Sequence, residues 1–146
     1  MKNIFYTTFF GTLLLFTNIT CEKEKNPPNP NLVYILNTTV VNGKWKIIQF
    51  NENNIDETKR YLGYRFTFNS GGTLLCNKIG CNIVGSWLGK NENNELELTL
   101  NFGTTTPHQE LNKDWYVKQI NSTLLKLEDM SITNGKTTYL TFTKAS

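Results

Sequence analysis

Short runs of alternating apolar and polar residues dominate the chain from residue 42 onward. In the run ELELTLNF at 95–102, every second residue is Leu or Phe, so these side chains share one face of an extended strand. Gly, Asn and Ser residues typical of turns bound the runs. The pattern predicts about eight short antiparallel strands, at 44–50, 64–69, 73–77, 82–88, 95–102, 115–120, 124–128 and 138–143.

Two stretches interrupt this alternation, at 54–62 and 107–114, and predict short helical turns. Closing about eight strands into a barrel removes the exposed edges that an open sheet would leave. We therefore expect an all-β fold, a small antiparallel up-and-down barrel. A β-sandwich is the alternative.

The N-terminus has a different pattern. Lys2 precedes an apolar run at 4–16, which is shorter than the roughly 20 residues that a membrane-spanning helix needs. This predicts a signal peptide at 1–20 followed by Cys21, where a lipoprotein signal peptidase would cut, although Thr20 stands where Gly, Ala or Ser is usual. Because several acyl chains give stable anchoring, we expect a lipidated Cys21 and a location in the cell envelope, on the outer membrane, at its periplasmic face or the cell surface.

Residues 22–31 read EKEKNPPNPN and contain no apolar side chain. Such a segment cannot bury enough surface to offset its ordering entropy, so we expect a flexible, extended tether. The predicted organisation is a leader at 1–20, a lipidated cysteine with a tether at 21–41, and one domain at 42–146.

The charge of the chain excludes one class of partner. Once Lys2 is removed with the leader, 14 basic and 12 acidic residues remain, and no Lys/Arg stripe is visible. Nucleic acid binding would require such a stripe, so we expect no nucleic acid partner. We expect a monomer attached to the membrane through its lipid.

One family shares the order of motifs in the domain. Gly43-Lys44-Trp45 at the start of the first strand is followed by YRFTFNSGGT, VGSW, ELNKDWYV and LTF. This order resembles the lipocalin-like domains of Gram-negative bacterial lipoproteins, in which the tryptophan of Gly-x-Trp closes the bottom of the barrel. In lipocalins an arginine after the last strand lies over that tryptophan, and here Lys144 could replace it through a cation–π contact.

The resemblance implies a cup for a small apolar ligand. Strands of about six residues make this cup shallower than that of a full lipocalin. For each tryptophan of the candidate lining, core packing is favoured over ligand contact, because side chains can fill a barrel of short strands. That lining consists of Trp45, Trp87, Trp115, Phe66 and Phe68.

Two further cysteines flank a predicted hairpin tip. In an oxidising compartment, the spacing of Cys76 and Cys81 predicts a disulfide between adjacent strands; free thiols or half of a metal site are the alternatives. His108 is the only histidine, so a metal site would lack further ligands, and we expect no metal or cofactor. The pairing leaves Cys21 as the odd thiol.

Catalytic motifs are absent from the sequence. His108 lies close to Glu110, but a surface histidine beside a helix start is favoured over a general base. The carboxylate pairs at 56–57 and 128–129 are adjacent in sequence, and neighbours on a strand point to opposite faces. We therefore expect a non-catalytic protein, a binding module for a small apolar ligand or an envelope partner. The alternative is an assembly factor or hydrolase inhibitor with a filled barrel.

Overall fold

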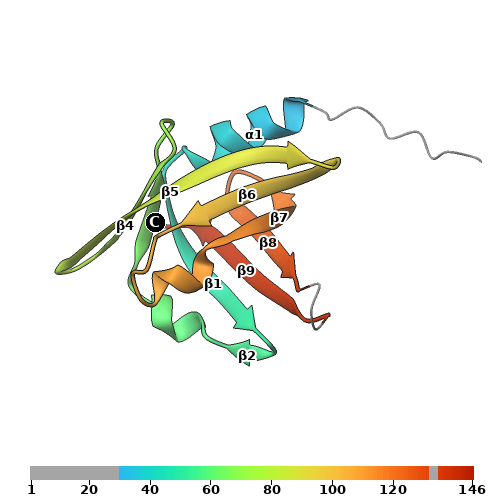
Figure 1. The fold of residues 1–146 in the computed structure, drawn as a ribbon. Helices are drawn as coiled ribbons and strands as arrows, with labels where there is room; N and C mark the ends of the chain where they lie inside the picture. Colours follow the sequence, from blue (N-terminus) through green and yellow to red (C-terminus); the bar gives the residue numbers. More distant parts are fainter. Residues whose placement is uncertain (1–29, 132–134) are drawn as a thin grey trace, which may run out of the picture.

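The computed structural model describes residues 30–131 and 135–146, so the expected leader, Cys21 and residues 22–29 lie outside the described residues. Over the described ranges the chain forms a β-barrel with one α-helix (Figure 1). The helical elements are α1 (Pro30–Val40) and two 3-10 helices, η1 (Thr58–Tyr61) and η2 (His108–Leu111). None of the helices in these ranges is long and apolar enough to cross a bilayer. The strands are β1 (Lys44–Glu52), β2 (Ile55–Asp56), β3 (Arg65–Phe68), β4 (Thr73–Lys78), β5 (Cys81–Glu92), β6 (Glu95–Asn101), β7 (Lys113–Ile120), β8 (Leu124–Met130) and β9 (Thr137–Lys144).

The sheet closes on itself. Strands β1 and β3 to β9 pair in chain order, each antiparallel to the next, and β9 pairs back onto β1. The two-residue β2 is an addition that folds back on the end of β1. Trp45 on β1 lies opposite Phe66 on β3 and Lys144 on β9, which joins the first and last strands of the barrel. The predicted all-β up-and-down barrel is confirmed, and the chain does not form the alternative sandwich.

The alternation of the sequence places the core. On β6, Leu98 and Leu100 point inward and are fully buried, while Thr99 between them faces the outer wall. The predicted helical turns are also confirmed, but each is shorter than expected. Residues 55–56 form β2 before η1, and Lys113 already begins β7 after η2.

The structure corrects the expected extent of the tether. Residues 30–40 form α1 rather than part of a flexible spacer. The physical reason is an apolar stripe: Leu36 and Val40 are four residues apart, lie on one face of the helix and are both fully buried. The helix packs on β5, where Leu36 and Asn37 approach Gly89. The absence of charge and the apolar residues at 32–41 were the available signals in the sequence.

Candidate functional site

The five candidates for lining a ligand cup are core residues, which is the interpretation that was favoured for the three tryptophans. Trp45, Trp115, Phe66 and Phe68 are at most 1% exposed, and Trp87 is 7% exposed. Backbone carbonyls accept all three indole N–H groups, at 2.8 Å for Trp45, 2.9 Å for Trp87 and 2.9 Å for Trp115. Their polar atoms are therefore satisfied within the protein, and the barrel interior around them is packed with side chains.

The N-terminal helix closes one end of the barrel. The Trp45 indole donates its hydrogen bond to the carbonyl of Val40, the last residue of α1. The Lys144 ammonium lies 3.9 Å from the centre of the Trp45 ring, which confirms the predicted cation–π contact. Lys144 Nζ is buried without a hydrogen-bond partner among the described residues, and this burial lowers the pKa of Lys144. The ring face is therefore its principal electrostatic contact.

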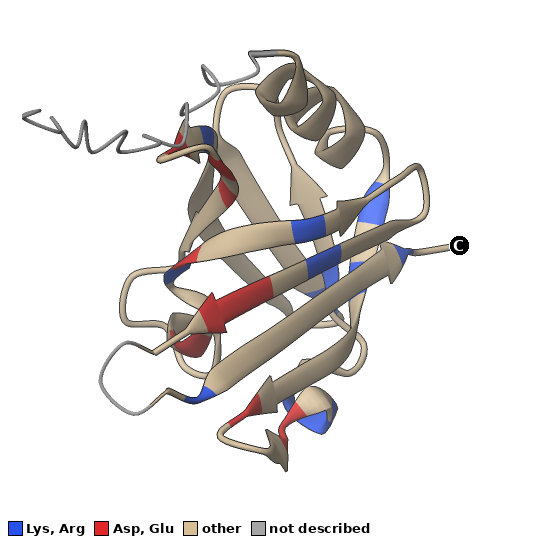
Figure 2. Ribbon diagram, turned by 90° about the vertical axis from the view of Figure 1, so that its right-hand side faces the viewer, with Lys and Arg blue, Asp and Glu red and all other residues tan. Residues whose placement is uncertain are grey.

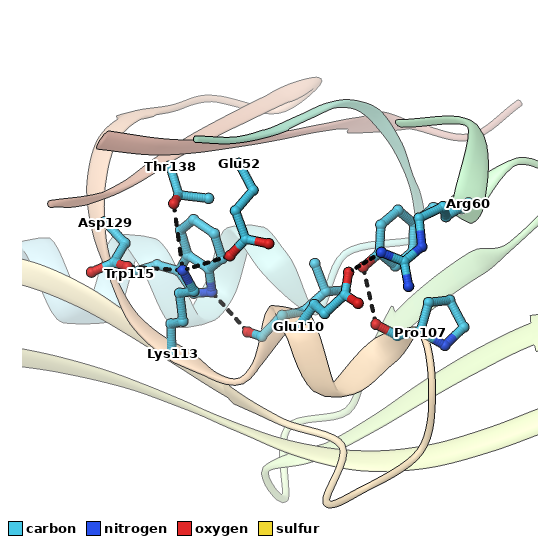
Figure 3. Close-up of polar contacts among 10 residues, drawn as sticks. Glu52, Arg60, Pro107, Glu110, Lys113, Trp115, Asp129 and Thr138 are labelled. Carbon is cyan, nitrogen blue, oxygen red and sulfur yellow. Dashed lines mark hydrogen bonds and ion pairs between the residues drawn. The ribbon is translucent and has the colours of Figure 1, made fainter. Parts of the chain in front are cut away.

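The two 3-10 helices close the other end (Figure 3). The Tyr61 hydroxyl of η1 donates a hydrogen bond of 3.1 Å to the carbonyl of Pro107, directly before η2. Arg60 of η1 forms an ion pair with Glu110 of η2, and this contact raises the pKa of Arg60. Leu111 of η2 is fully buried and its carbonyl accepts the Trp115 indole hydrogen bond. The mouth of the barrel is thus covered in the state that the structure shows.

A lysine holds several strands together at this same end. Lys113 Nζ lies 3.0 Å from Asp129 on β8 and 3.4 Å from Glu52 on β1 (Figure 3). The Thr138 hydroxyl on β9 is 3.4 Å away, and the Trp115 ring centre is 5.6 Å away. One cation therefore contacts three neighbouring strands. Sequence reasoning did not single out Lys113, whose place beside the inward-facing Trp115 in KDWYV was the available signal.

Behind η2, a histidine and a cysteine meet in the core. His108 was expected at the surface, but it is fully buried, and its Nε2 lies 3.1 Å from the Cys76 sulfur. Burial raises the pKa of the Cys76 thiol to about 12 and lowers the pKa of His108. The pair is therefore uncharged at neutral pH. The imidazole of His108 is also surrounded by four aromatic rings, whose centres lie 4.6–6.1 Å from its own. These are the rings of Tyr61, Tyr64, Phe66 and Phe102.

The predicted disulfide between Cys76 and Cys81 is not formed, and both are free thiols. The register of the β4–β5 hairpin is the reason: it sets Cys76 opposite Ile83 and Cys81 opposite Lys78. The two sulfurs are thus not on directly opposed residues. Within the described part of the chain, no group of three or more His, Cys, Asp or Glu residues could hold a metal ion.

The adjacent carboxylates at 128–129 point to opposite sides of β8, as predicted. Asp129 faces the interior and contacts Lys113, whereas Glu128 faces the outer wall, 3.9 Å from Lys118.

A groove runs over strands β5 to β8 from the outer wall to the barrel edge, where the inward-facing Lys113 and Asp129 also line it, and we call it the acidic groove. It consists of two adjoining hollows of about 290 Å³ and about 470 Å³, which share Tyr116 and Met130. At the centre of the groove, the strand register places four residues directly opposite one another on neighbouring strands, so that they form one row. That row runs Lys90, Glu97, Tyr116 and Glu128. Sequence reasoning missed Tyr116, although its alternation with the inward-facing Trp115 places it on the outer wall.

The acidic groove carries a charge opposite in sign to that of the whole chain. Its lining includes six carboxylates and three lysines, a net charge of −3, whereas the full chain has a formal charge of +3. Lys90 lies 2.8 Å from Glu92, 3.1 Å from Glu97 and 3.4 Å from Asp114. Hydrogen bonds to Glu92 and Glu97 raise the pKa of Lys90. The six carboxylates are Glu92, Glu95, Glu97, Asp114, Glu128 and Asp129.

A separate hollow has the opposite net charge. A hollow of about 390 Å³ near the β4–β5 hairpin is lined by Lys44, Arg65 and Lys78 and by no carboxylate. Figure 2 shows acidic and basic positions beside one another along the strands that face the viewer. The acidic groove and this hollow therefore differ in the sign of their net charge, although the acidic groove also contains three lysines.

Comparison with known proteins shows the fold. No family model and no curated protein matches the sequence. The chain is similar to a DUF4847 family protein of Bacteroides vulgatus, with 19% identity, a TM-score of 0.53, and coverage of 75% of this chain and 97% of that one. An uncharacterised protein of Bacteroides eggerthii is similar at 16% identity, with a TM-score of 0.42 and coverage of 70% and 98%. The first likeness supports the barrel fold.

Proposed function

We propose that the protein is a lipid-anchored, non-catalytic interaction module of the bacterial cell envelope, which binds a basic segment of a partner protein in the acidic groove. The observation that carries this proposal is the position of the available binding surface. The candidate lining residues of the interior are at most 7% exposed. The acidic groove, in contrast, is open to solvent. Among its carboxylates it contains the aromatic ring of Tyr116 and the thioether of Met130.

The chemistry of the groove favours a basic partner. Its net charge of −3 attracts Lys and Arg side chains and speeds their approach. The Tyr116 ring offers a surface for the stem or guanidinium of such a residue. Glu95 in the same lining has no ion pair among the described contacts. A small apolar ligand could contact Tyr116 and Met130 but would make no use of the surrounding carboxylates.

A peptide of known composition tests the groove. We expect deca-lysine to shift the amide resonances of 95–97, 114–118 and 128–130 in the mature lipoprotein held in lipid nanodiscs, and deca-glutamate to leave them unchanged. The double variant Glu97→Gln/Glu128→Gln should weaken the effect several-fold, and higher salt should weaken it further. Equal shifts in the double variant, or shifts centred on interior residues, would contradict the proposal.

Native mass spectrometry separates this proposal from a ligand-carrying barrel. The mature protein purified from its own host should show the mass of the protein with its lipid and no further small molecule. A retained apolar molecule would instead support a ligand inside the barrel.

The anchor has its own test. A Cys21→Ala variant should leave the membrane fraction, whereas the matched control Cys81→Ala should remain in it. Retention of the Cys21→Ala protein in the membrane would refute the anchoring part of the proposal.

A further inference from the structure

The outer face of α1 carries apolar side chains that no part of the described structure covers. Leu32 is 41% exposed, Tyr34 67% and Ile35 40%. The helix contains no charged residue along its whole length. The side chains of Leu36 and Val40 are buried against the barrel; Tyr34 and Ile35 point away from this buried stripe, and Leu32 lies at its edge, one turn before Leu36. Exposed apolar residues on a helix that is already packed on its other side indicate a second contact.

We infer that this face of α1 lies in the interfacial region of the membrane that holds the lipid anchor, so that the barrel is docked on the bilayer rather than held away from it. The inference rests on the proposed lipidation of Cys21. Residues Leu32, Tyr34 and Ile35 are the membrane-contacting residues, and phospholipid headgroups and upper acyl chains are the ligand.

The length of chain between the anchor and the helix supports this occupant. Nine Cα–Cα steps separate Cys21 from Pro30, which is the first residue of α1. Even fully extended, nine steps reach only about 32 Å. The helix therefore starts within about the thickness of one bilayer core from the lipidated residue. Among the described elements, α1 is the nearest in sequence to Cys21, so it is the first of them that the anchor brings to the membrane.

The side chains are suited to the interface. Tyrosine is enriched at the boundary between headgroups and acyl chains, where its ring is buried and its hydroxyl remains wet. Leu and Ile beside it add apolar area. Because α1 has no charge, the contact is expected to depend little on salt, unlike that of the acidic groove. Together with an acyl anchor, this contact would supply a second attachment and would fix the orientation of the barrel.

A fluorescent probe on the same helix face tests the inference in the full-length lipoprotein. Thr38 is exposed on α1, so a Thr38→Cys variant in a Cys81→Ser background can carry an environment-sensitive dye while the three apolar residues remain in place. The matched control carries the dye at Ile79→Cys, because Ile79 is fully exposed at the tip of the β4–β5 hairpin. Both proteins are placed on vesicles of phosphatidylethanolamine and phosphatidylglycerol that contain a nitroxide-labelled phospholipid.

We expect the nitroxide lipid to quench the dye at position 38 at least two-fold more than the dye at position 79. The double variant Tyr34→Ser/Ile35→Ser should reduce this quenching to the level of the control, while the protein still sediments with the vesicles. Sedimentation with equal, weak quenching at both positions would overturn the docking inference and leave the anchor intact. Failure to sediment would overturn both. A dye at position 38 that is shielded from water in detergent solution as well would overturn membrane docking in favour of a second copy of the chain.

Discussion

Gly85 and Gly89 on β5 allow other parts of the chain to approach this strand closely. Replacing each glycine with alanine should therefore destabilise the protein, and the structure predicts which replacement costs more. Gly85 lies where β5 passes from pairing with β4 to pairing with β6. A Cβ atom added there would lie 2.6 Å from the backbone oxygen of Asn101 and 2.7 Å from the Phe102 ring. At Gly89, an added Cβ would lie 2.2 Å from Asn37 Oδ1 and 3.0 Å from a methyl carbon of Leu36, both on α1.

The neighbours differ in how far they can move, and this fixes the order of the effects. The Asn101 oxygen belongs to a paired strand, so Gly85→Ala must displace backbone and should lower the free energy of unfolding by about 3 kcal/mol, the upper end for overpacking. The Asn37 amide is the flexible end of a side chain, so Gly89→Ala should cost about 1–2 kcal/mol. Gly71 has open space around it, and Gly71→Ala should change the stability by less than about 0.5 kcal/mol.

Urea unfolding of the three variants, followed by tryptophan fluorescence, measures this order. Native-state hydrogen exchange adds a specific readout, because Gly89→Ala should reduce protection in α1 and Gly85→Ala in β5 and β6. Gly71→Ala is the matched control for loss of glycine flexibility. Equal stabilities of Gly89→Ala and Gly71→Ala, with α1 protection unchanged, would refute the close packing of α1 on β5.

Further predictions concern the buried polar groups. Burial lowers the pKa of His108 below its value in the unfolded chain, so the protein should lose stability as the pH falls below about 6.5 and the unfolded state takes up a proton. The urea midpoint of the wild-type protein should therefore decrease between about pH 7.5 and about pH 5, and it should decrease less in His108→Leu. The same decrease in both proteins would contradict this. Trp45→Ala should lower the free energy of unfolding by about 3–5 kcal/mol, whereas Lys144→Met, which keeps the stem but removes the cation, should cost no more than about 1–2 kcal/mol in the same denaturation assay. In the native protein a thiol reagent should modify the partly exposed Cys81 and spare the buried Cys76 until urea unfolds the barrel; simultaneous modification would show that the core around Cys76 opens readily.

The fold was largely predictable because the core positions repeat with period two. In ELELTLN, Leu98 and Leu100 are buried and Leu96 is partly buried, on the face that the alternation predicts. The helix α1 was missed because Pro30 and the Asn-rich start of the segment resemble a linker, whereas the burial of Leu36 and Val40 against the barrel is a tertiary contact. Short helices of this kind derive their stability from tertiary packing rather than from local propensity.

The candidate site was less predictable than the fold, since it depends on register. The alternation of KDWYV separates Trp115 from Tyr116, but only the pairing across β6, β7 and β8 sets Tyr116 between Glu97 and Glu128. The same holds for the cysteines: Cys76 and Cys81 are near in sequence, yet the hairpin register opposes each to another residue. His108 was expected at the surface because a lone polar residue beside a turn is usually solvated, whereas η2 turns it into the core.

The packing of the interior and the charge of the groove both support the proposed binding surface on the outside of the barrel. A barrel that is covered by α1 at one end and by η1 and η2 at the other can admit a ligand only by separating contacts such as Tyr61 with Pro107 and Arg60 with Glu110. Binding on the outer wall requires no such rearrangement, because the acidic groove is already open. If α1 also rests on the membrane, the groove is carried on a barrel of fixed orientation, and a partner meets its carboxylates from one direction. Fixing the orientation in this way reduces the rotational freedom lost on association, so even a modest electrostatic attraction would yield useful affinity.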